Sequence, residues 1–334
     1  MSAEAAEVGA VGPAPAGAER RPDDMRRYLD PRVLSRIHRL DLRTRLVVEG
    51  FLAGLHRSPY HGLSVEFAEH REYAPGDDLK FLDWRVYSRT DRYYIKQYEA
   101  ETNLRCTFLV DVSESMKYAG EAREGQGLTK FHYGACVAAS LALLLLRQQD
   151  AVGLVTFDED WVAHLPTSAN PGQIKSVCRL LEQASHSLKA KTALDAVCRR
   201  ACETISHRGL VCVISDLLVD DRVALLRALV RLTRRGHDVM VMHILDEDEL
   251  NFPFEGNTRF IALEQEGELT GDGRALRDGY LEALRGFLRY VQRECVSQRI
   301  DYTTVNTSEP LGAVLARFLA RREALGRRSA SKRR

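Results

Sequence analysis

The sequence has 334 residues, of which 45% are hydrophobic and 28% charged, and its formal net charge is +1. This length accommodates one large α/β domain with an appendage, or two domains. The near-neutral balance excludes a global attraction to nucleic acid or anionic membranes, so we expect neither as a partner. Seven cysteines without a Cys-x-x-Cys pair are typical of buried thiols in a reducing compartment.

The first 24 residues are rich in Ala, Gly and Pro. Such a composition cannot bury enough apolar surface to order itself, so we expect residues 1–24 to form a disordered tail. This segment lacks the apolar core of a signal peptide. The most apolar run of the chain, residues 135–146, is shorter than the roughly 20 residues that cross a bilayer. We therefore expect a soluble, cytoplasmic protein without a membrane span.

Residues 25–101 are predicted to form an N-terminal helical segment followed by a distinct block. Apolar residues at helical spacing predict one or two helices within residues 30–54, with Pro31 at the first helical position.

The block at residues 62–101 alternates aromatic and charged residues, and Pro75-Gly76 indicates a turn. Arginines among aromatic rings can stack nucleobases, but the acidic residues of this block would repel a phosphate backbone. We expect a small hairpin appendage, held by ion pairs of Arg71 or Arg85 with neighbouring aspartates.

From residue 102 to residue 322, apolar strand-like runs alternate with helical patterns. The predicted strands are 106–110, 151–157, 210–216, 238–245 and 301–306, with a short companion at 160–165 and an edge strand at 259–263. The predicted helices are 130–149, 172–185, 192–205, 221–235, 273–297 and 310–322. This alternation predicts an α/β fold with a doubly wound, mostly parallel sheet covered by helices on both faces. The basic stretch 323–334 lacks apolar periodicity and is expected to be a solvated tail.

Three oxygen-bearing side chains follow the first of these strands at alternate positions, namely Asp111, Ser113 and Ser115. In an open α/β sheet, ligands bind in the crevice beyond the carboxyl ends of the strands. Carboxylate and hydroxyl oxygens there suit a hard cation such as Mg²⁺. The same residue types are also common in turns and helix caps, which need no ligand.

A second strand end carries Ser215-Asp216, and Thr192 begins a predicted helix after a third loop. Parallel strands end at the same edge of the sheet, so Asp216 can meet Asp111 there, and Thr192 can add a hydroxyl. Thr192 and Ser215-Asp216 are equally compatible with plain helix capping.

Asp111, Ser113, Ser115, Thr192 and Asp216 together resemble the metal-ion-dependent adhesion site of the von Willebrand factor A domain. The preceding block, GLHRSPYHGLSVEFAEHREYAPGDDLKFLDW, and the approach YEAETNLRCTFLVDVSESM resemble the bacterial family called domain of unknown function fifty-eight. In that family a von Willebrand A-like domain follows such a block. The resemblance covers about residues 29–322.

The resemblance implies a Rossmann-type sheet with Mg²⁺, or another divalent cation, at its switch point. Ser113 and Ser115 would bind the ion directly, Thr192 directly or through water, and Asp111 and Asp216 would hold the ion's water molecules. A hydroxyl-rich set of ligands leaves most of the ion's charge available to a carboxylate of a partner protein.

The resemblance therefore implies a non-enzymatic adaptor. Genes of the family commonly lie beside those of MoxR-type AAA+ ATPases. The implied partners are such an ATPase and its client proteins, in chaperone-like assembly or maturation. Many relatives carry transmembrane helices ahead of the block, whereas this sequence has the Ala/Gly/Pro-rich tail and the helices at 30–54.

A metal-dependent hydrolase or phosphatase is the alternative, with Asp111 as nucleophile or with the ion activating a water molecule. The sequence offers no second carboxylate motif or histidine cluster that would supply a base. The adaptor is therefore favoured over the enzyme.

Overall fold

The computed structural model describes residues 30–55, 70–72, 87–89, 92–96, 104–120, 128–185, 192–219, 221–263 and 267–331. The tail expected at residues 1–24 and most of the 62–101 block, including the expected ion pairs of Arg71 and Arg85, lie outside the described side chains. Two short strands of that block are described, and they pair antiparallel: β1 (His70–Glu72) and β2 (Tyr94–Lys96).

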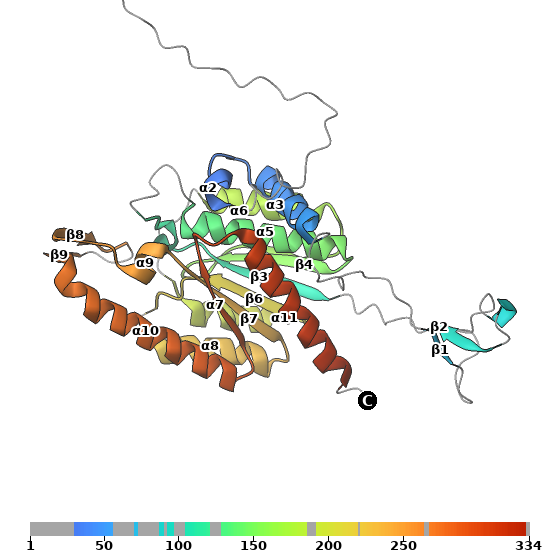
Figure 1. The fold of residues 1–334 in the computed structure, drawn as a ribbon. Coiled ribbons are helices and arrows are strands. Elements are labelled where there is room, and N and C mark those ends of the chain that lie inside the picture. The colour runs from blue at the N-terminus through green and yellow to red at the C-terminus, as the bar shows by residue number, and fades with distance from the viewer. Residues whose placement is uncertain are drawn as a thin grey trace, which may run out of the picture.

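A six-stranded sheet forms the centre of the fold, in the order β10-β7-β6-β3-β4-β5 (Figure 1). Its strands are β3 (Arg105–Asp111), β4 (Ala151–Phe157), β5 (Trp161–Ser168), β6 (Leu210–Ser215), β7 (Asp238–Leu245) and β10 (Asp301–Asn306). All neighbours are parallel except β5, which runs antiparallel to β4. The predicted α/β class with a mostly parallel sheet flanked by helices is confirmed.

The order of the strands reverses at β3. The chain runs from β3 outward through β4 to β5, and then returns to the other side of β3 to build β6, β7 and β10. Ligands bind at such a switch point in open α/β sheets, beyond the carboxyl ends of the strands. In β3 this end is Asp111.

Helices cover both faces of the sheet because consecutive residues in the middle of its central strands are apolar and buried on both sides. In β3, Phe108 and Val110 belong to one hydrophobic core, and Leu109 between them belongs to the other. The first core is covered by α3 (Leu40–Leu55), α5 (Lys130–Arg147), α6 (Gln173–Ala184) and α11 (Leu311–Ser331). The second core is covered by α7 (Leu194–Thr204), α8 (Arg222–Arg234) and α10 (Gly273–Ser297), as Figure 1 shows.

The N-terminal helices pack into the first core. The short helix α2 (Pro31–Leu34) begins at Asp30, whose side chain accepts the backbone N–H of Arg32. Leu34, Val47 and Val48 are fully buried in the core that also contains α5. This part of the N-terminal segment thus shares its apolar contacts with the sheet domain.

The elements near the C-terminus differ most from their predictions. The predicted edge strand at 259–263 is β8 (Asn257–Ile261), which pairs with β9 (Glu268–Asp272) in a separate two-stranded sheet. The short helix α9 (Glu247–Asn251) follows β7 and was not predicted. Helix α11 continues to Ser331, beyond its predicted end at residue 322.

Helix α5 is long and apolar enough to cross a membrane by length and composition, and among the described residues no other helix is. In the structure 83% of this helix is buried inside the protein, where it covers the sheet. Its apolar character is therefore accounted for by the hydrophobic core.

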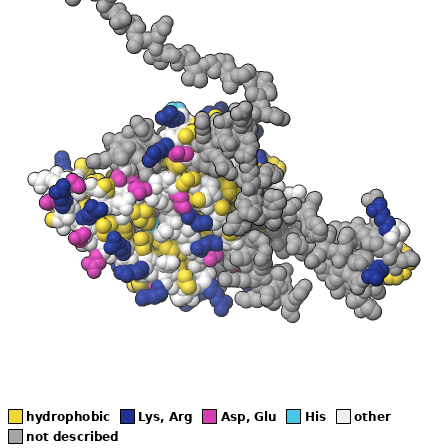
Figure 2. All heavy atoms as spheres, viewed as in Figure 1, with side chains coloured by type: hydrophobic (Ala, Val, Ile, Leu, Met, Phe, Trp, Pro, Cys, Tyr) yellow, Lys and Arg dark blue, Asp and Glu magenta, His cyan; other side chains and the backbone are white. Residues whose placement is uncertain are grey.

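Exposed arginines gather on α8 and α10, although the net charge of the chain is only +1. In Figure 2, dark blue side chains follow the lower edge of this face, where Figure 1 places these two helices. The exposed arginines are Arg222, Arg227, Arg231 and Arg234 on α8, and Arg274, Arg277, Arg285, Arg289 and Arg293 on α10.

Candidate functional site

Asp111 ends the central strand β3 and is fully buried. Both of its carboxylate oxygens accept hydrogen bonds. Oδ1 accepts the backbone N–H of Ser113 (2.9 Å), while Oδ2 accepts the hydroxyls of Ser215 (2.5 Å) and Thr192 (3.3 Å). Asp111 therefore joins three loops that are far apart in the sequence.

Ser113 and Ser115 lie in the turn that follows Asp111. Ser113 occupies the N-cap position of a single 3-10 turn, η3 (Glu114–Lys117), but makes no side-chain capping bond. Both serines are buried, with exposed fractions of 0% and 1%. Their hydroxyl oxygens lie 3.1 Å apart and share a hydrogen bond. Adjacent oxygen ligands of an octahedral Mg²⁺ at 2.0–2.1 Å are separated by about 2.9 Å, so the two hydroxyls are spaced as neighbouring ligands of one ion.

Asp216 follows β6, directly beside the end of β3, and is buried. Its Oδ1 accepts the backbone N–H of Leu218 (3.2 Å), and its Oδ2 accepts the ammonium group of Lys130 (2.7 Å). Leu217, which lies between Asp216 and Leu218 in the sequence, has a positive φ of 52°. Such backbone geometry in a non-glycine residue is costly and is concentrated at functional sites.

The structure thus brings all five predicted residues into one cluster: Asp111, Ser113, Ser115, Thr192 and Asp216. Thr192 is half-buried and precedes α7, whose first residues contain no side-chain cap. Its hydroxyl is used by Asp111 and not by the helix end.

Lys130 and Glu249 belong to the site and were not predicted. Lys130, at the start of α5, is 2% exposed, and its ammonium group also donates to Oε1 of Glu249 (2.8 Å). Glu249 completes a capping box of α9, because its Oε2 accepts the backbone N–H of Asp246 (2.7 Å). In sequence, Lys130 looks like an ordinary first-turn helix residue, and no local pattern indicates that it is buried.

The two buried aspartates have opposite pKa shifts. Burial, and to a smaller extent the negative charge of Asp216, raise the pKa of Asp111 to about 7, although the hydrogen bonds from Ser215 and Ser113 lower it. Burial also opposes the ionisation of Asp216. However, the positive charge of Lys130 holds the pKa of Asp216 below its usual value, together with the hydrogen bonds that Lys130 and Ser115 donate to it. Asp216 is therefore the fixed negative charge, and Asp111 the carboxyl that titrates near neutrality.

This donor set can hold a small hard cation. Among the described residues, no group of three or more His, Cys, Asp or Glu side chains has the arrangement of a metal site. Any ion here would depend on the hydroxyls of Ser113, Ser115 and Thr192 together with the charge of Asp111 and Asp216. Hydroxyl and carboxylate oxygens are ligands that Mg²⁺ accepts, and they are poor ligands for softer metals.

Two kinds of known protein resemble this chain. Uncharacterized proteins of Mycobacterium tuberculosis and Mycobacterium bovis are 25% identical to it over 301 residues, which is 88% of this chain and 90% of theirs. Among solved structures, an aerotolerance-related membrane protein from Bacteroides fragilis is 18% identical, with a TM-score of 0.43, over 64% of this chain and 97% of that chain. The conserved hypothetical protein BatB from Bacteroides thetaiotaomicron is 16% identical, with a TM-score of 0.44, over 65% of this chain and 98% of that chain.

A family profile matches residues 69–286, well over half of the chain, and these residues include all five members of the cluster around Asp111. The chain therefore belongs to the family described as Protein of unknown function DUF58.

Proposed function

We propose that this protein is a non-enzymatic adaptor that binds a partner protein through a divalent cation, preferably Mg²⁺, in a von Willebrand factor A-like domain. One observation carries the proposal. The Ser113 and Ser115 hydroxyls lie 3.1 Å apart beside the buried carboxylate of Asp111, at the switch point of the sheet. In a plain helix cap the serine hydroxyl would bond the backbone of its own turn, which Ser113 does not do although it occupies the N-cap position.

In this proposal Ser113 and Ser115 hold the cation directly, and Thr192 does so directly or through water. Asp111 and Asp216 supply negative charge and orient water molecules around it. Lys130 neutralises part of that charge, because its ammonium group pairs with Asp216. When bound, the cation would offer a Lewis-acidic position to a carboxylate of the partner.

The proposed partner is a MoxR-type AAA+ ATPase, acting with client proteins in chaperone-like assembly or maturation in the cytoplasm. This part rests on the resemblance of the motif and its preceding block to the family. The proposed site suits such a role because its charge is provided by few carboxylates, which leaves the cation attractive to an acidic side chain of a partner.

The alternative, a hydrolase or phosphatase with Asp111 as nucleophile, has weaker support. Asp111 is fully buried, and its two oxygens accept three hydrogen bonds. A nucleophilic carboxylate needs a lone pair directed at the substrate. The hydrogen bonds of Asp111 instead suit a role in positioning the surrounding loops.

The test is a pull-down of the MoxR-type ATPase of the source genome by the full-length chain, with Mg²⁺ and with EDTA. We expect Mg²⁺-dependent capture by the wild type and its loss in Ser113→Ala. Ser140→Ala is the matched control, because Ser140 is a fully buried serine of α5 whose hydroxyl has no hydrogen-bond partner among the described residues. Capture that is equal in EDTA, or equal in the two variants, would refute the metal-dependent adaptor. Mg²⁺-dependent hydrolysis of a generic phosphoester, lost in Ser113→Ala, would favour the hydrolase.

A further inference from the structure

A polar pocket lies at the amino-terminal ends of the parallel strands, opposite the end that carries Asp111. Its cavity of about 220 Å³ is formed where β3 and β6 begin and where α7 ends. Arg105 is the first residue of β3 and Asp111 its last, six residues away. At about 3.3 Å per residue this separates the two sites by about 20 Å, so the pocket is independent of the proposed metal site.

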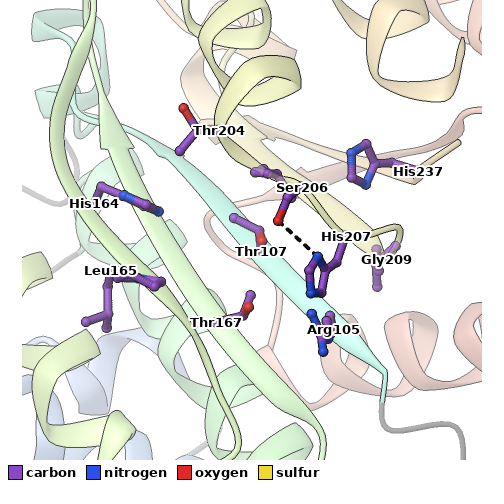
Figure 3. Close-up of a pocket in the computed structure, with 13 residues that line it drawn as sticks. Arg105, Thr107, His164, Leu165, Thr167, Thr204, Ser206, His207, Gly209 and His237 are labelled. Atoms are coloured by element: carbon purple, nitrogen blue, oxygen red, sulfur yellow. Dashed lines mark hydrogen bonds between the residues drawn. The ribbon is translucent and has the colours of Figure 1, made fainter. Parts of the chain in front are cut away.

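The polar side chains that line this pocket are an arginine, three histidines, a serine and threonines, beside apolar residues such as Leu165 and Ile205. Figure 3 shows Arg105, His164, His207 and His237 around the cavity, with Ser206 beside His207. The Ser206 hydroxyl and Nδ1 of His207 are 2.9 Å apart and share a hydrogen bond. Asp and Glu are absent from the described lining residues, so the pocket offers no negative side chain to repel an anion.

His237 provides a second, independent indication of a ligand. Its side chain is 4% exposed, and neither ring nitrogen has a hydrogen-bond partner among the described residues. The carbonyl of Gly209, which accepts the backbone N–H of Asp238 (3.0 Å), is near the ring but outside hydrogen-bonding geometry with its nitrogens. Burial lowers the pKa of His237, against the influence of the Gly209 carbonyl, so this imidazole is neutral at pH 7. A buried polar ring without partners is unfavourable, and a group in the pocket would relieve that cost.

The chemistry of a neutral imidazole selects among anions. One of its nitrogens donates a hydrogen bond and the other accepts one. A sulfate ion can only accept, whereas a hydrogenphosphate or phosphomonoester monoanion carries both acceptor oxygens and an O–H donor. The guanidinium of Arg105 adds a planar fork of donors that matches two oxygens of a phosphoryl group.

We propose that this pocket binds a phosphoryl group, as inorganic phosphate or as part of a small phosphomonoester. Arg105 pairs with its charge, and His237 and Ser206 contact its remaining oxygens. Helix α7 ends at the pocket, and the dipole at its carboxyl end opposes an anion. This opposition weakens the site, so we expect a Kd on the order of 1 mM for inorganic phosphate and a lower Kd for an ester whose organic part also contacts Leu165 and Ile205.

The test uses the full-length chain labelled with ¹⁵N in its histidines. Inorganic phosphate is added up to about 20 mM at pH 7 and constant ionic strength, well above a millimolar Kd. The His237 ring signals are assigned by their loss in His237→Phe. We expect saturable shifts of the His237 ring signals, and an affinity about fivefold or more weaker in Arg105→Gln. Because Arg105 is exposed, Arg105→Gln should keep the fold and test the proposal even if His237→Phe fails to fold.

Arg147→Gln is the matched control, because Arg147 is an exposed arginine at the end of α5 that does not line the pocket. It removes the same charge and should leave the affinity within about twofold. Phenyl phosphate and inorganic phosphate, both titrated at pH 6, where about half of a phosphomonoester keeps its O–H, compare the two sources: tighter binding of the ester supports an ester, and weaker binding supports the free ion. The absence of saturable shifts, sulfate binding as tight as phosphate binding, or equal effects of the two arginine variants would each overturn the proposal.

Discussion

The ammonium nitrogen of Lys130 lies 2.7 Å from Oδ2 of Asp216, and each side chain is only 2% exposed. The same nitrogen is 2.8 Å from Glu249. Burial alone would favour the neutral forms of Lys130 and Asp216. Their mutual attraction instead raises the pKa of Lys130 above its usual value and lowers the pKa of Asp216 below its usual value. The buried charges of Asp216 and Lys130 therefore depend on each other.

Removing this ammonium group should destabilise the protein strongly. Lys130→Met leaves Asp216 buried without its cation, which typically costs about 3–5 kcal/mol of unfolding free energy. Urea denaturation at pH 7 measures the loss. Lys117→Met is the control, because Lys117 pairs with Glu114 at the surface (3.0 Å) and should cost no more than about 1 kcal/mol. A similar cost for both variants would show that Asp216 does not depend on Lys130.

The contribution of Asp111 to the stability of the metal-free protein should fall as the pH rises from about 4 to about 7, whereas the buried His243, whose pKa is lowered to about 4, contributes stability that rises over the same range. The pKa of Asp111 is about 7 in the folded protein and 3.8 in the reference state, so the folded protein binds more protons in this range. Stability then decreases with pH, by at most about 4 kcal/mol for this carboxyl. Asp216 acts in the opposite direction, because its lowered pKa contributes stability that is lost as the pH falls.

The contribution of Asp111 can be isolated with Asp111→Asn, which removes its titration and keeps its shape. Unfolding in urea with EDTA gives the change in unfolding free energy from pH 4.5 to pH 7.5, and this change should be more negative for the wild type than for the variant. Equal changes would mean that Asp111 is ionised throughout.

Binding of Mg²⁺ should release a proton below pH 7. The proposed site needs an ionised Asp111, which is protonated below a pKa of about 7 in the metal-free protein. The affinity for Mg²⁺ should therefore rise by up to tenfold per pH unit below 7 and level off above it. Calorimetry at pH 6 in two buffers with different ionisation enthalpies counts the released protons, with about one expected. A Mg²⁺ affinity that is independent of pH would contradict this coupling.

Thr192→Val should weaken Mg²⁺ binding with little effect on the metal-free protein. The hydroxyl of Thr192 makes one long hydrogen bond of 3.3 Å to Asp111, so its loss should cost about 1 kcal/mol or less. In the wild type, Mg²⁺ at 100 times its Kd adds about 2.7 kcal/mol of stability, and the variant should lose much of this gain. Thr233→Val is the control, because Thr233 is a half-buried threonine of α8 that bonds the carbonyl of Val230. Equal stabilisation of both variants by Mg²⁺ would exclude Thr192 from the site.

Arg299→Gly should stabilise the protein by up to about 1 kcal/mol. Arg299 follows α10 with a positive φ of 60°, a conformation that glycine adopts without the steric cost of a Cβ. Gln298→Gly is the control, because Gln298 has a φ of −96° and its replacement should only add chain entropy to the unfolded state. Thermal unfolding distinguishes the two, and a lower Tm for Arg299→Gly would contradict the prediction.

The central strands and the cluster at their ends were predictable because their signals are local. Strands β4, β7 and β10 and helix α10 have their predicted bounds, since continuous apolar runs and helical periodicity are read within one segment. The membership of Asp111, Ser113 and Asp216 in one cluster followed from a rule of topology, namely that parallel strands end at the same edge of the sheet.

Other features depend on contacts between distant segments. Strand β8 lies in a separate sheet because β9 satisfies its backbone groups, and an isolated strand pattern does not name its partner. His237 and Arg105 share a pocket although 132 positions separate them, and neither residue is part of a motif.

By itself, the sequence determined the alternation of strands and helices and the oxygen-bearing residues at two strand ends, because apolar periodicity and residue chemistry act over a few neighbouring positions. Only the tertiary structure decided the electrostatics of the cluster. Lys130 reaches Asp216 and Glu249 across 86 and 119 positions of the chain. The buried ion pairs set which aspartate is ionised, and such pairs form only when packing removes water from both charges.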